Sequence, residues 1–101
     1  MRHDVPVILI GETYTQDDMG VPRATETQTQ VFAQITSVSA SEWFEGGRAG
    51  LNPEFRAEIY SAEYSGQKIL VKDGTRYGVY RTYQKNIDRI ELYCELKKGS
   101  E

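Results

Sequence analysis

Residues 31–47 read VFAQITSVSASEWFEGG, and this stretch decides the fold because its pattern changes halfway. Val31, Ala33 and Ile35 fall on one side of an extended chain, and the residues between them fall on the other. A period of two is typical of a strand with one buried face. The first half of the stretch therefore predicts a strand in a sheet with an apolar inner side.

The second half of the stretch carries the signals of a short helix. Ser39 and Glu42 have the spacing of a capping box, in which the hydroxyl accepts from the Glu42 amide and the carboxylate returns to the Ser39 amide. Val38 and Trp43 match a hydrophobic staple around that cap. The glycines at 46–47 predict a left-handed stop. Such an arrangement favours an interaction element over a catalytic one. The long loop expected next runs through Arg48, Gly50, Asn52 and Pro53.

The N-terminal part of the chain predicts a strand, a loop and an extended approach to residue 31. Residues 5–10 are rich in β-branched side chains and predict a first strand. Pro6 places this strand at an edge or makes its start irregular, because proline cannot donate to a ladder. The segment 11–22 contains Thr, Asp, Gly and Pro turn formers and predicts a long, mobile loop. The Thr-rich segment 23–30 is compatible with extended chain.

The C-terminal half predicts further strands. Apolar and polar residues alternate over 55–60, which predicts a strand with one face exposed to solvent or to a partner. Residues 68–72 and 75–83 flank Asp73-Gly74, the commonest sequence for a type I′ turn, and so predict a β-hairpin. Residues 88–96 alternate strictly. The inward positions of that last strand are Ile90, Leu92, Cys94 and Leu96.

Together these elements predict one all-β domain over residues 1–101. Several short strands without a long helical period are typical of a small β-barrel or sandwich. We expect about six strands, one short helix after the second main strand, and long mobile loops. The length allows one domain with a small core.

The composition limits the class of function. Hydrophobic residues make up 39% of the chain, and seven Tyr and one Trp suit surfaces that become buried in an assembly. A net charge of −3 and a pI near 5.2 argue against sequence-independent nucleic-acid binding, which needs clustered Lys and Arg. The apolar run at 7–10 is too short to span a bilayer, and a lone Cys94 cannot form an internal disulfide. We expect a soluble, unexported protein of a reducing cytosol.

Few residues have catalytic or metal-binding potential. His3 is the only histidine, which excludes a histidine-dependent triad or a multi-histidine zinc site within one chain unless His3 itself is recruited. Asp17 and Asp18 lack the ligand spacing of an EF-hand. Glu42 and Glu45 resemble an acid/base pair, but Glu42 is assigned to the helix cap. We therefore expect no catalytic residue, no metal and no cofactor.

Three apolar residues have a structural interpretation beside a functional one. Cys94 fits the inward face of the last strand, where a buried thiol is inert. The hydrophobic staple with Val38 gives Trp43 a structural role. One local contact cannot satisfy two large aromatic side chains, so Phe44 stays open between the core and an interface.

The chain resembles the phage head-tail joining family, the head completion or stopper proteins of long-tailed phages and prophages. The resemblance runs almost end to end and rests on the order and spacing of short segments. They are IGETYT (10–15) leading to DMG (18–20), VFA (31–33) through SASEWF (39–44), GRAGLNPE (47–54), RYGVYRTY (76–83) and ELYCE (91–95).

The resemblance implies a small β-barrel that assembles into a ring below the portal. It implies three protein partners: further copies of the chain, the portal or an adaptor, and a tail completion or tail tube protein. Packaged double-stranded DNA would pass through the channel without sequence-specific binding, and no membrane is involved. The implied location is the virion neck, after assembly in the host bacterial cytoplasm.

The resemblance also implies which residues make contacts. The loop between the central strands, Ser41 to Glu54, would project into or around the channel, and the first loop would dock a partner. The subunit and channel residues are Ser41, Glu42, Trp43, Phe44, Glu45, Gly46, Gly47, Arg48, Gly50, Asn52, Pro53 and Glu54. The docking residues of the first loop are Tyr14, Asp17, Asp18, Met19 and Gly20.

Two other classes of function stay open from the residues alone. A small β-barrel module could recognise a ligand or peptide through Tyr60, Tyr80 and Tyr93. An enzyme could use the acidic pairs Asp17-Asp18 or Glu42/Glu45 with a metal.

Overall fold

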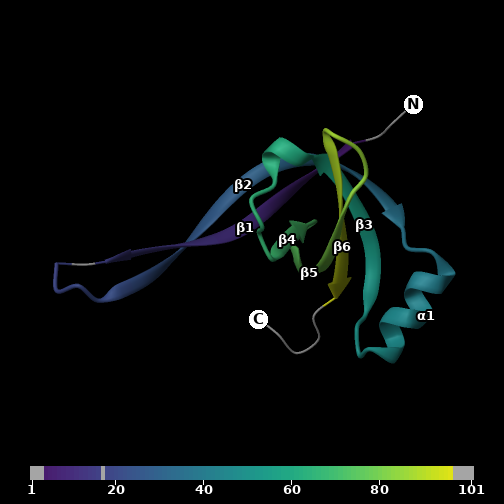
Figure 1. Cartoon of the computed structure of the whole chain (residues 1–101), viewed down its shortest axis with the longest axis horizontal. Coiled ribbons are helices and arrows are strands. Elements are labelled where there is room, and N and C mark those ends of the chain that lie inside the picture. Colours follow the sequence, from purple (N-terminus) through teal and green to yellow (C-terminus); the bar gives the residue numbers. More distant parts are fainter. Residues whose placement is uncertain (1–3, 17, 97–101) are drawn as a thin grey trace.

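The computed structural model describes residues 4–16 and 18–96, and their strands close into an antiparallel barrel in the order β1-β2-β3-β6-β5-β4 (Figure 1). This confirms the predicted small all-β barrel with one short helix after the second strand. The elements are β1 (Asp4–Gln16), β2 (Pro22–Ser37), α1 (Ala40–Arg48), β3 (Pro53–Tyr60), the 3-10 helix η1 (Ser61–Glu63), β4 (Ile69–Lys72), β5 (Thr75–Gln84) and β6 (Arg89–Leu96).

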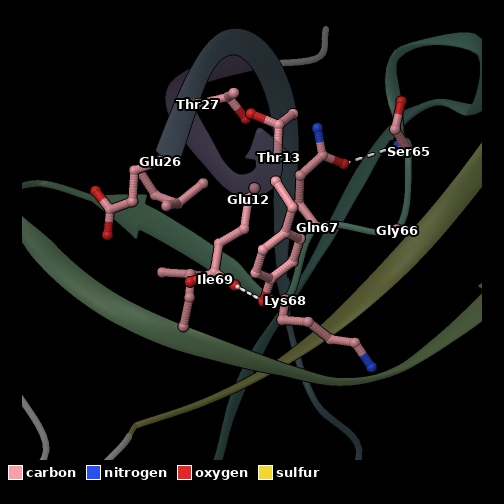
Figure 2. A pocket seen from close by; sticks show the side chains of 12 residues that line it. Glu12, Thr13, Glu26, Thr27, Ser65, Gly66, Gln67, Lys68 and Ile69 are labelled. Carbon is pink, nitrogen blue, oxygen red and sulfur yellow. Dashed lines mark hydrogen bonds between the residues drawn. The ribbon is translucent and has the colours of Figure 1, made fainter. Parts of the chain in front are cut away.

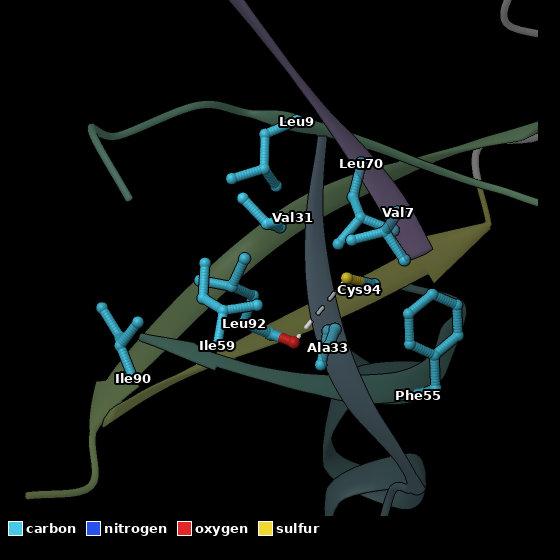
Figure 3. Packing of buried hydrophobic residues seen from close by; sticks show 11 residues of the cluster. Val7, Leu9, Val31, Ala33, Phe55, Ile59, Leu70, Ile90, Leu92 and Cys94 are labelled. Atoms are coloured by element: carbon cyan, nitrogen blue, oxygen red, sulfur yellow. Dashed lines mark hydrogen bonds between the residues drawn. The ribbon is translucent and has the colours of Figure 1, made fainter. Parts of the chain in front are cut away.

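The core of the barrel is formed by alternate residues of five strands, and Tyr77 and Val79 of β5 pack against it. Val31 and Ala33 are buried, and Ile35 packs against the cluster, as the period of two predicts. Tyr93 was expected outward but is 8% exposed, because the Arg81 guanidinium lies 3.9 Å from its ring centre. Figure 3 shows the cluster: Val7, Leu9, Val31, Ala33, Phe55, Ala57, Ile59, Leu70, Ile90, Leu92 and Cys94.

The β4–β5 hairpin is confirmed at its turn. Asp73 and Gly74 have φ angles of 53° and 77°, the positive values that a type I′ turn requires at both central residues. The strand of Pro6 is not an edge strand, because β1 pairs with both β2 and β4 in the closed barrel. Pro6 itself pairs with Phe32 of β2, in a part of β1 outside the Ile8–Ile10 segment that pairs with β4.

The predicted loop over residues 11–22 is wrong, because β1 continues to Gln16 and β2 begins at Pro22. The two strands stay paired from Gly11↔Thr27 outward. Threonine counts among the turn formers of this segment, but its β-branched side chain also favours strands. Cross-strand pairs such as Thr13↔Thr25 extend the two strands here in place of the predicted loop. The turn itself is short, with Gly20 at φ +79°.

The outer part of this hairpin projects from the barrel as a two-stranded ribbon, which we define as residues 11–16 and 22–30. In the described residues, β1 pairs with β4 only over Ile8–Ile10, and β2 pairs with β3 only over Gln34–Ser37. Figure 1 shows the ribbon leaving the barrel on the side away from α1. The molecule measures 51 × 32 × 25 Å, and its radius of gyration of 15.0 Å exceeds the ~13 Å of a compact domain of this length.

Candidate functional site

The helix α1 begins as its sequence predicts. The Ser39 side chain accepts from the amide of Glu42 at 3.1 Å, which satisfies one of the free donors of the first turn. The reciprocal half of the predicted capping box is wrong. The Glu42 carboxylate is directed to β5, where it accepts from the Tyr80 hydroxyl at 2.6 Å and from the Arg81 guanidinium at 2.6 Å. A residue assigned to local capping therefore holds the helix to the barrel.

The end of α1 differs from the prediction of a stop at 46–47. Both glycines lie inside the helix, and the left-handed residue is Gly50 at φ +83°. The amide of Leu51 donates to the carbonyl of Gly46 at 2.8 Å, and that of Gly50 to the carbonyl of Gly47 at 3.1 Å. These two bonds form a Schellman motif. The predicted mobile loop after Gly46 is therefore a helical turn with a defined end.

Gly46 has a packing role that its sequence position did not reveal. It is buried, and a Cβ on it would lie 2.5 Å from Cγ of Pro53, the first residue of β3. The connection back to the sheet is also tied to β6, since the amide of Leu96 donates to the carbonyl of Asn52 at 3.0 Å. The side of α1 that carries Glu42 and Gly46 thus faces the barrel.

The contacts of Glu42 set its acidity. The hydrogen bond from Arg81 lowers the pKa of Glu42; burial opposes this shift and the hydrogen bond from Tyr80 adds to it. Burial, followed by donation to Glu42, raises the pKa of Tyr80. The Tyr80 and Tyr93 rings meet edge to face at 6.3 Å, and Arg81 stacks on Tyr93. The three tyrosines of the predicted binding surface therefore do not form one surface. Tyr80 and Tyr93 lie at the contact between Glu42 and Arg81, and Tyr60 lies at the end of β3.

Trp43 and Phe44 project from the opposite side of α1. Their side chains are 55% and 62% exposed, and their rings meet edge to face at 5.2 Å. The interpretation of Phe44 as a core residue is wrong. On a helix of 3.6 residues per turn, Trp43, Phe44, Gly47 and Arg48 share one arc, which we call the aromatic face of α1.

The remaining residues of the predicted channel loop lie in α1, its C-terminal turn and the start of β3. Glu45 pairs with Arg48 at 3.6 Å in a largely exposed ion pair, so Glu42 and Glu45 have different partners and do not form an acid/base pair. Pro53 is buried, and Glu54 is exposed in β3. Their roles in subunit or channel contacts stay predictions.

The residues predicted to dock a partner lie at the tip of the ribbon. Tyr14 is 70% and Met19 85% exposed, and Asp18 and Gly20 are also exposed. Asp17, like His3, lies outside the described residues. The tip therefore carries large side chains far from the barrel core.

The ribbon exposes both of its faces, and residues 22–30 are all exposed. Its register places Glu12 directly opposite Glu26, a like-charge pair that destabilises a hairpin, with Arg76 at 3.5 Å from Glu26. An isolated two-stranded hairpin is only marginally stable in water, and free strand edges invite a further strand. Such an element gains most from a partner.

A groove of about 600 Å³ lies where the ribbon leaves the barrel (Figure 2). Its wall includes Gln67, whose side chain accepts from the amide of Ser65 at 2.7 Å. No residue pattern predicts this groove, because its two walls are far apart in the chain. The lining residues are Ile10, Gly11, Glu12, Thr13, Tyr14, Glu26, Thr27, Ser65, Gly66, Gln67, Lys68 and Ile69.

A smaller hollow of about 380 Å³ lies at the end of β3, and we call it the Tyr60 hollow. Its most exposed member is Ile87, which is 95% exposed on the turn between β5 and β6. Sequence reasoning missed it, since an isolated isoleucine in a polar turn gives no pattern. The lining residues are Tyr60, Ser61, Ala62, Glu63, Ile87 and Asp88.

A buried carboxylate supports one wall of this hollow. Glu58 accepts from Arg89 at 2.8 Å and from Lys85 at 2.9 Å. Burial raises the pKa of Glu58, but these two hydrogen bonds outweigh it and leave the pKa below its ordinary value. The guanidinium carbon of Arg89 lies 4.3 Å from the centre of the Tyr60 ring. The Tyr60 ring thus packs against Arg89, which is itself held by Glu58.

Comparison with known proteins gives no match to a family model and none to a curated protein. Over residues 4–16 and 18–96, no group of three or more His, Cys, Asp and Glu side chains is placed to hold a metal ion. In the same residues, no helix has the length and apolarity needed to cross a membrane.

Proposed function

We propose that this chain is a structural, non-enzymatic component of the neck of a long-tailed phage or prophage. It forms a homo-oligomeric ring between the portal or adaptor and the tail, completes the DNA-filled head and offers a docking surface to the tail. The proposal rests on the resemblance of the ordered segments in the sequence and on one structural observation. A barrel with a complete core carries a ribbon that has two exposed faces and buries nothing of its own.

The surfaces outside the core fit this function. The ribbon and α1 lie on different sides of the barrel (Figure 1), so one copy can contact two neighbours at once. Tyr and Trp side chains dominate the energetics of many interfaces. The net charge of −3 also limits adhesion to the phosphates of DNA passing through a channel.

The test is assembly with the portal-side partner. Purified chain is mixed with the portal or adaptor protein of the same phage or prophage and studied by negative-stain microscopy and native mass spectrometry. We expect closed rings of this chain stacked on the partner. A chain that stays monomeric, and does not bind the partner at any ratio, contradicts the proposal.

The groove of Figure 2 favours one alternative, a ligand- or peptide-binding module. Its volume is in the range of small-molecule sites, and Tyr14 and Lys68 border it. Under this alternative a monomer would bind a ligand saturably, and Lys68→Ala would weaken that binding without affecting rings.

A further inference from the structure

We propose that the aromatic face of α1 in one copy inserts into the Tyr60 hollow of the next copy. The inference rests on the proposed self-assembly and names the contact that propagates it. Trp43 and Phe44 are the inserted side chains, and Tyr60 and Ile87 receive them. The partner is therefore a second copy of this chain, in a head-to-tail contact.

The inserted side is rigid before it meets a partner. Glu42 and Gly46 hold the opposite side of the helix to the barrel through Arg81 and Pro53. Gly47 lies between the aromatic residues on the exposed arc, and a Cβ there would meet no atom within 4 Å. Gly47 therefore places no side chain between the two rings, and a preorganised aromatic pair loses little entropy on binding.

The receiving side is also built in advance. The Asn86 side chain accepts from the amides of Asp88 at 3.1 Å and Arg89 at 3.0 Å, which fixes the turn that carries Ile87. The amide of Ser61 donates to the carbonyl of Asp88 at 2.8 Å and ties η1 to the same turn. An isoleucine held 95% exposed on an ordered turn is available as an apolar contact.

Charge complementarity favours a second copy as the occupant. Arg48 stands beside the two aromatic rings on α1, and its pair with Glu45 is exposed and 3.6 Å long, so little is lost when it changes partner. Glu63 and Asp88 border the hollow. An aromatic pair with an adjacent cation therefore meets an apolar hollow with an acidic border. The larger groove at the ribbon has Lys68 in its lining beside Glu12 and Glu26, so its border is not purely acidic and it matches this face less well.

The two surfaces lie at opposite ends of one strand. Gly46 packs on Pro53, the first residue of β3, while the hollow begins at Tyr60, its last. A reciprocal two-fold exchange of a protrusion and a hollow would join only two copies, whereas the proposed insertion runs one way, from each copy into the next. Such an insertion gives a heterologous contact, which generates a ring when the rotation between copies closes.

Disulfide trapping on the full chain tests this contact. Phe44→Cys and Ile87→Cys change exposed side chains and leave the core intact, and Cys94 is fully buried. The double variant should form a ladder of dimers, trimers and longer species under mild oxidation. Each single variant should stay monomeric, and an equimolar mixture of the two should give a one-to-one dimer. The control pairs Phe44→Cys with Thr75→Cys, an exposed position on the β4–β5 hairpin.

Second substitutions in the double-cysteine background test the specificity of the contact. Trp43→Ala should lower the yield of cross-linked species by about tenfold, since truncation of an anchor residue has such an effect. Arg48→Glu should also lower it, and Glu63→Arg added to Arg48→Glu should restore it. No ladder, a ladder as strong in the Thr75→Cys control, or dimers of Phe44→Cys alone would overturn the contact.

Ring formation separates this contact from the proposed function. Rings on the portal-side partner that form equally with wild type and with Trp43→Ala contradict the contact and leave the neck function standing. A ladder from the double variant, together with a wild-type chain that ignores the portal-side partner, supports the contact and contradicts the neck function.

Discussion

Glu42 connects the helix to the barrel through side chains 38 and 39 positions away in the sequence. Its side chain is 17% exposed, and two of its hydrogen bonds are 2.6 Å long. Short hydrogen bonds to a charged group are stronger than neutral ones. At the scale of a single residue, this carboxylate therefore contributes more to the fold than the capping role suggested by its spacing from Ser39.

The substitution Glu42→Gln removes the charge and keeps the shape. We expect a loss of about 1–2 kcal/mol in the free energy of unfolding, because the Arg81 contact becomes neutral. The matched control is Glu45→Gln, in an exposed pair with Arg48, where the change should stay within ~0.5 kcal/mol. Urea titration measures both, and equal effects would contradict the anchoring role.

The same contact predicts a pH dependence. The pKa of Glu42 in the folded chain lies below its ordinary value of 4.5, so its contribution is complete above pH 4.5 and is lost as the pH falls through 4.5 toward the folded pKa. Wild-type stability should decrease over that acidic range. Glu42→Gln should show a shallower decrease in urea titrations repeated at each pH, with Glu58 supplying the remainder.

Cys94 should be unreactive in the folded chain. It is fully buried in the core, and burial raises the pKa of its thiol to about 12. The thiolate is the reactive form, so a thiol reagent at neutral pH should label Cys94 only after denaturation. Rapid labelling of the native protein would contradict this placement.

At the scale of elements, α1 and the ribbon are the two parts that the barrel does not need for its core. The helix depends on close approach to β3, because Gly46 packs on Pro53, while the ribbon depends mainly on pairing between its own two strands, with one exposed ion pair from Glu26 to Arg76 of β5. Their stabilities should therefore respond to different substitutions.

Two adjacent glycines provide a matched test of helix docking. Gly46→Ala should destabilise the fold by about 1–3 kcal/mol, because its Cβ would overlap Pro53. Gly47→Ala meets no atom within 4 Å and should stabilise it by up to ~1 kcal/mol through helix propensity. Thermal and urea unfolding measure the pair; stabilisation by both would mean that α1 does not pack on Pro53.

Excision of the ribbon separates folding from assembly. Residues 12–26 are replaced by Asn-Gly, which joins the paired positions Gly11 and Thr27 with a two-residue turn. We expect unfolding free energy within ~1 kcal/mol of wild type, since the removed residues add nothing to the core cluster, and loss of binding to a neck partner. A shortened chain that unfolds, or that still assembles fully, contradicts this division.

At the scale of the whole molecule, the barrel strands share a buried core, whereas the helix and the ribbon leave apolar side chains exposed. The core cluster draws on five strands, with β5 packed against it. Exposed large apolar side chains include Tyr14 on the ribbon, Trp43 and Phe44 on α1 and Ile87 in the β5–β6 turn, beside Phe32, Tyr60 and Tyr83 on the barrel strands. This distribution is expected of a chain that folds as a monomer and then assembles through preformed surfaces.

Trp43→Ala tests that distinction directly. Since Trp43 is 55% exposed, we expect a loss of at most ~1 kcal/mol in stability, mainly from its edge contact with Phe44. Assembly into rings should fail under conditions where the wild type forms them. Calorimetry and negative-stain microscopy on the same preparation check the two parts. A loss of several kcal/mol in the free energy of unfolding would contradict the exposed placement of Trp43.

The sequence by itself determined the class of fold and several local details. Alternation at Val31, Ala33 and Ile35, the Asp73-Gly74 turn and the Ser39 cap were all predicted correctly, because each depends on the sterics and hydrogen bonding of neighbouring residues. Such short-range signals survive in any fold that contains the segment.

Only the tertiary structure decided the candidate surfaces. Glu42 meets Arg81, Gly46 meets Pro53, and Tyr60 lies beside Ile87 because strand register brings distant segments together. The ribbon replaced a predicted loop for the same reason, since pairing of residues 11–16 with 22–27 outweighed their local turn preferences. Register is set by the whole barrel, so residue patterns within one segment cannot specify which side chains meet across it.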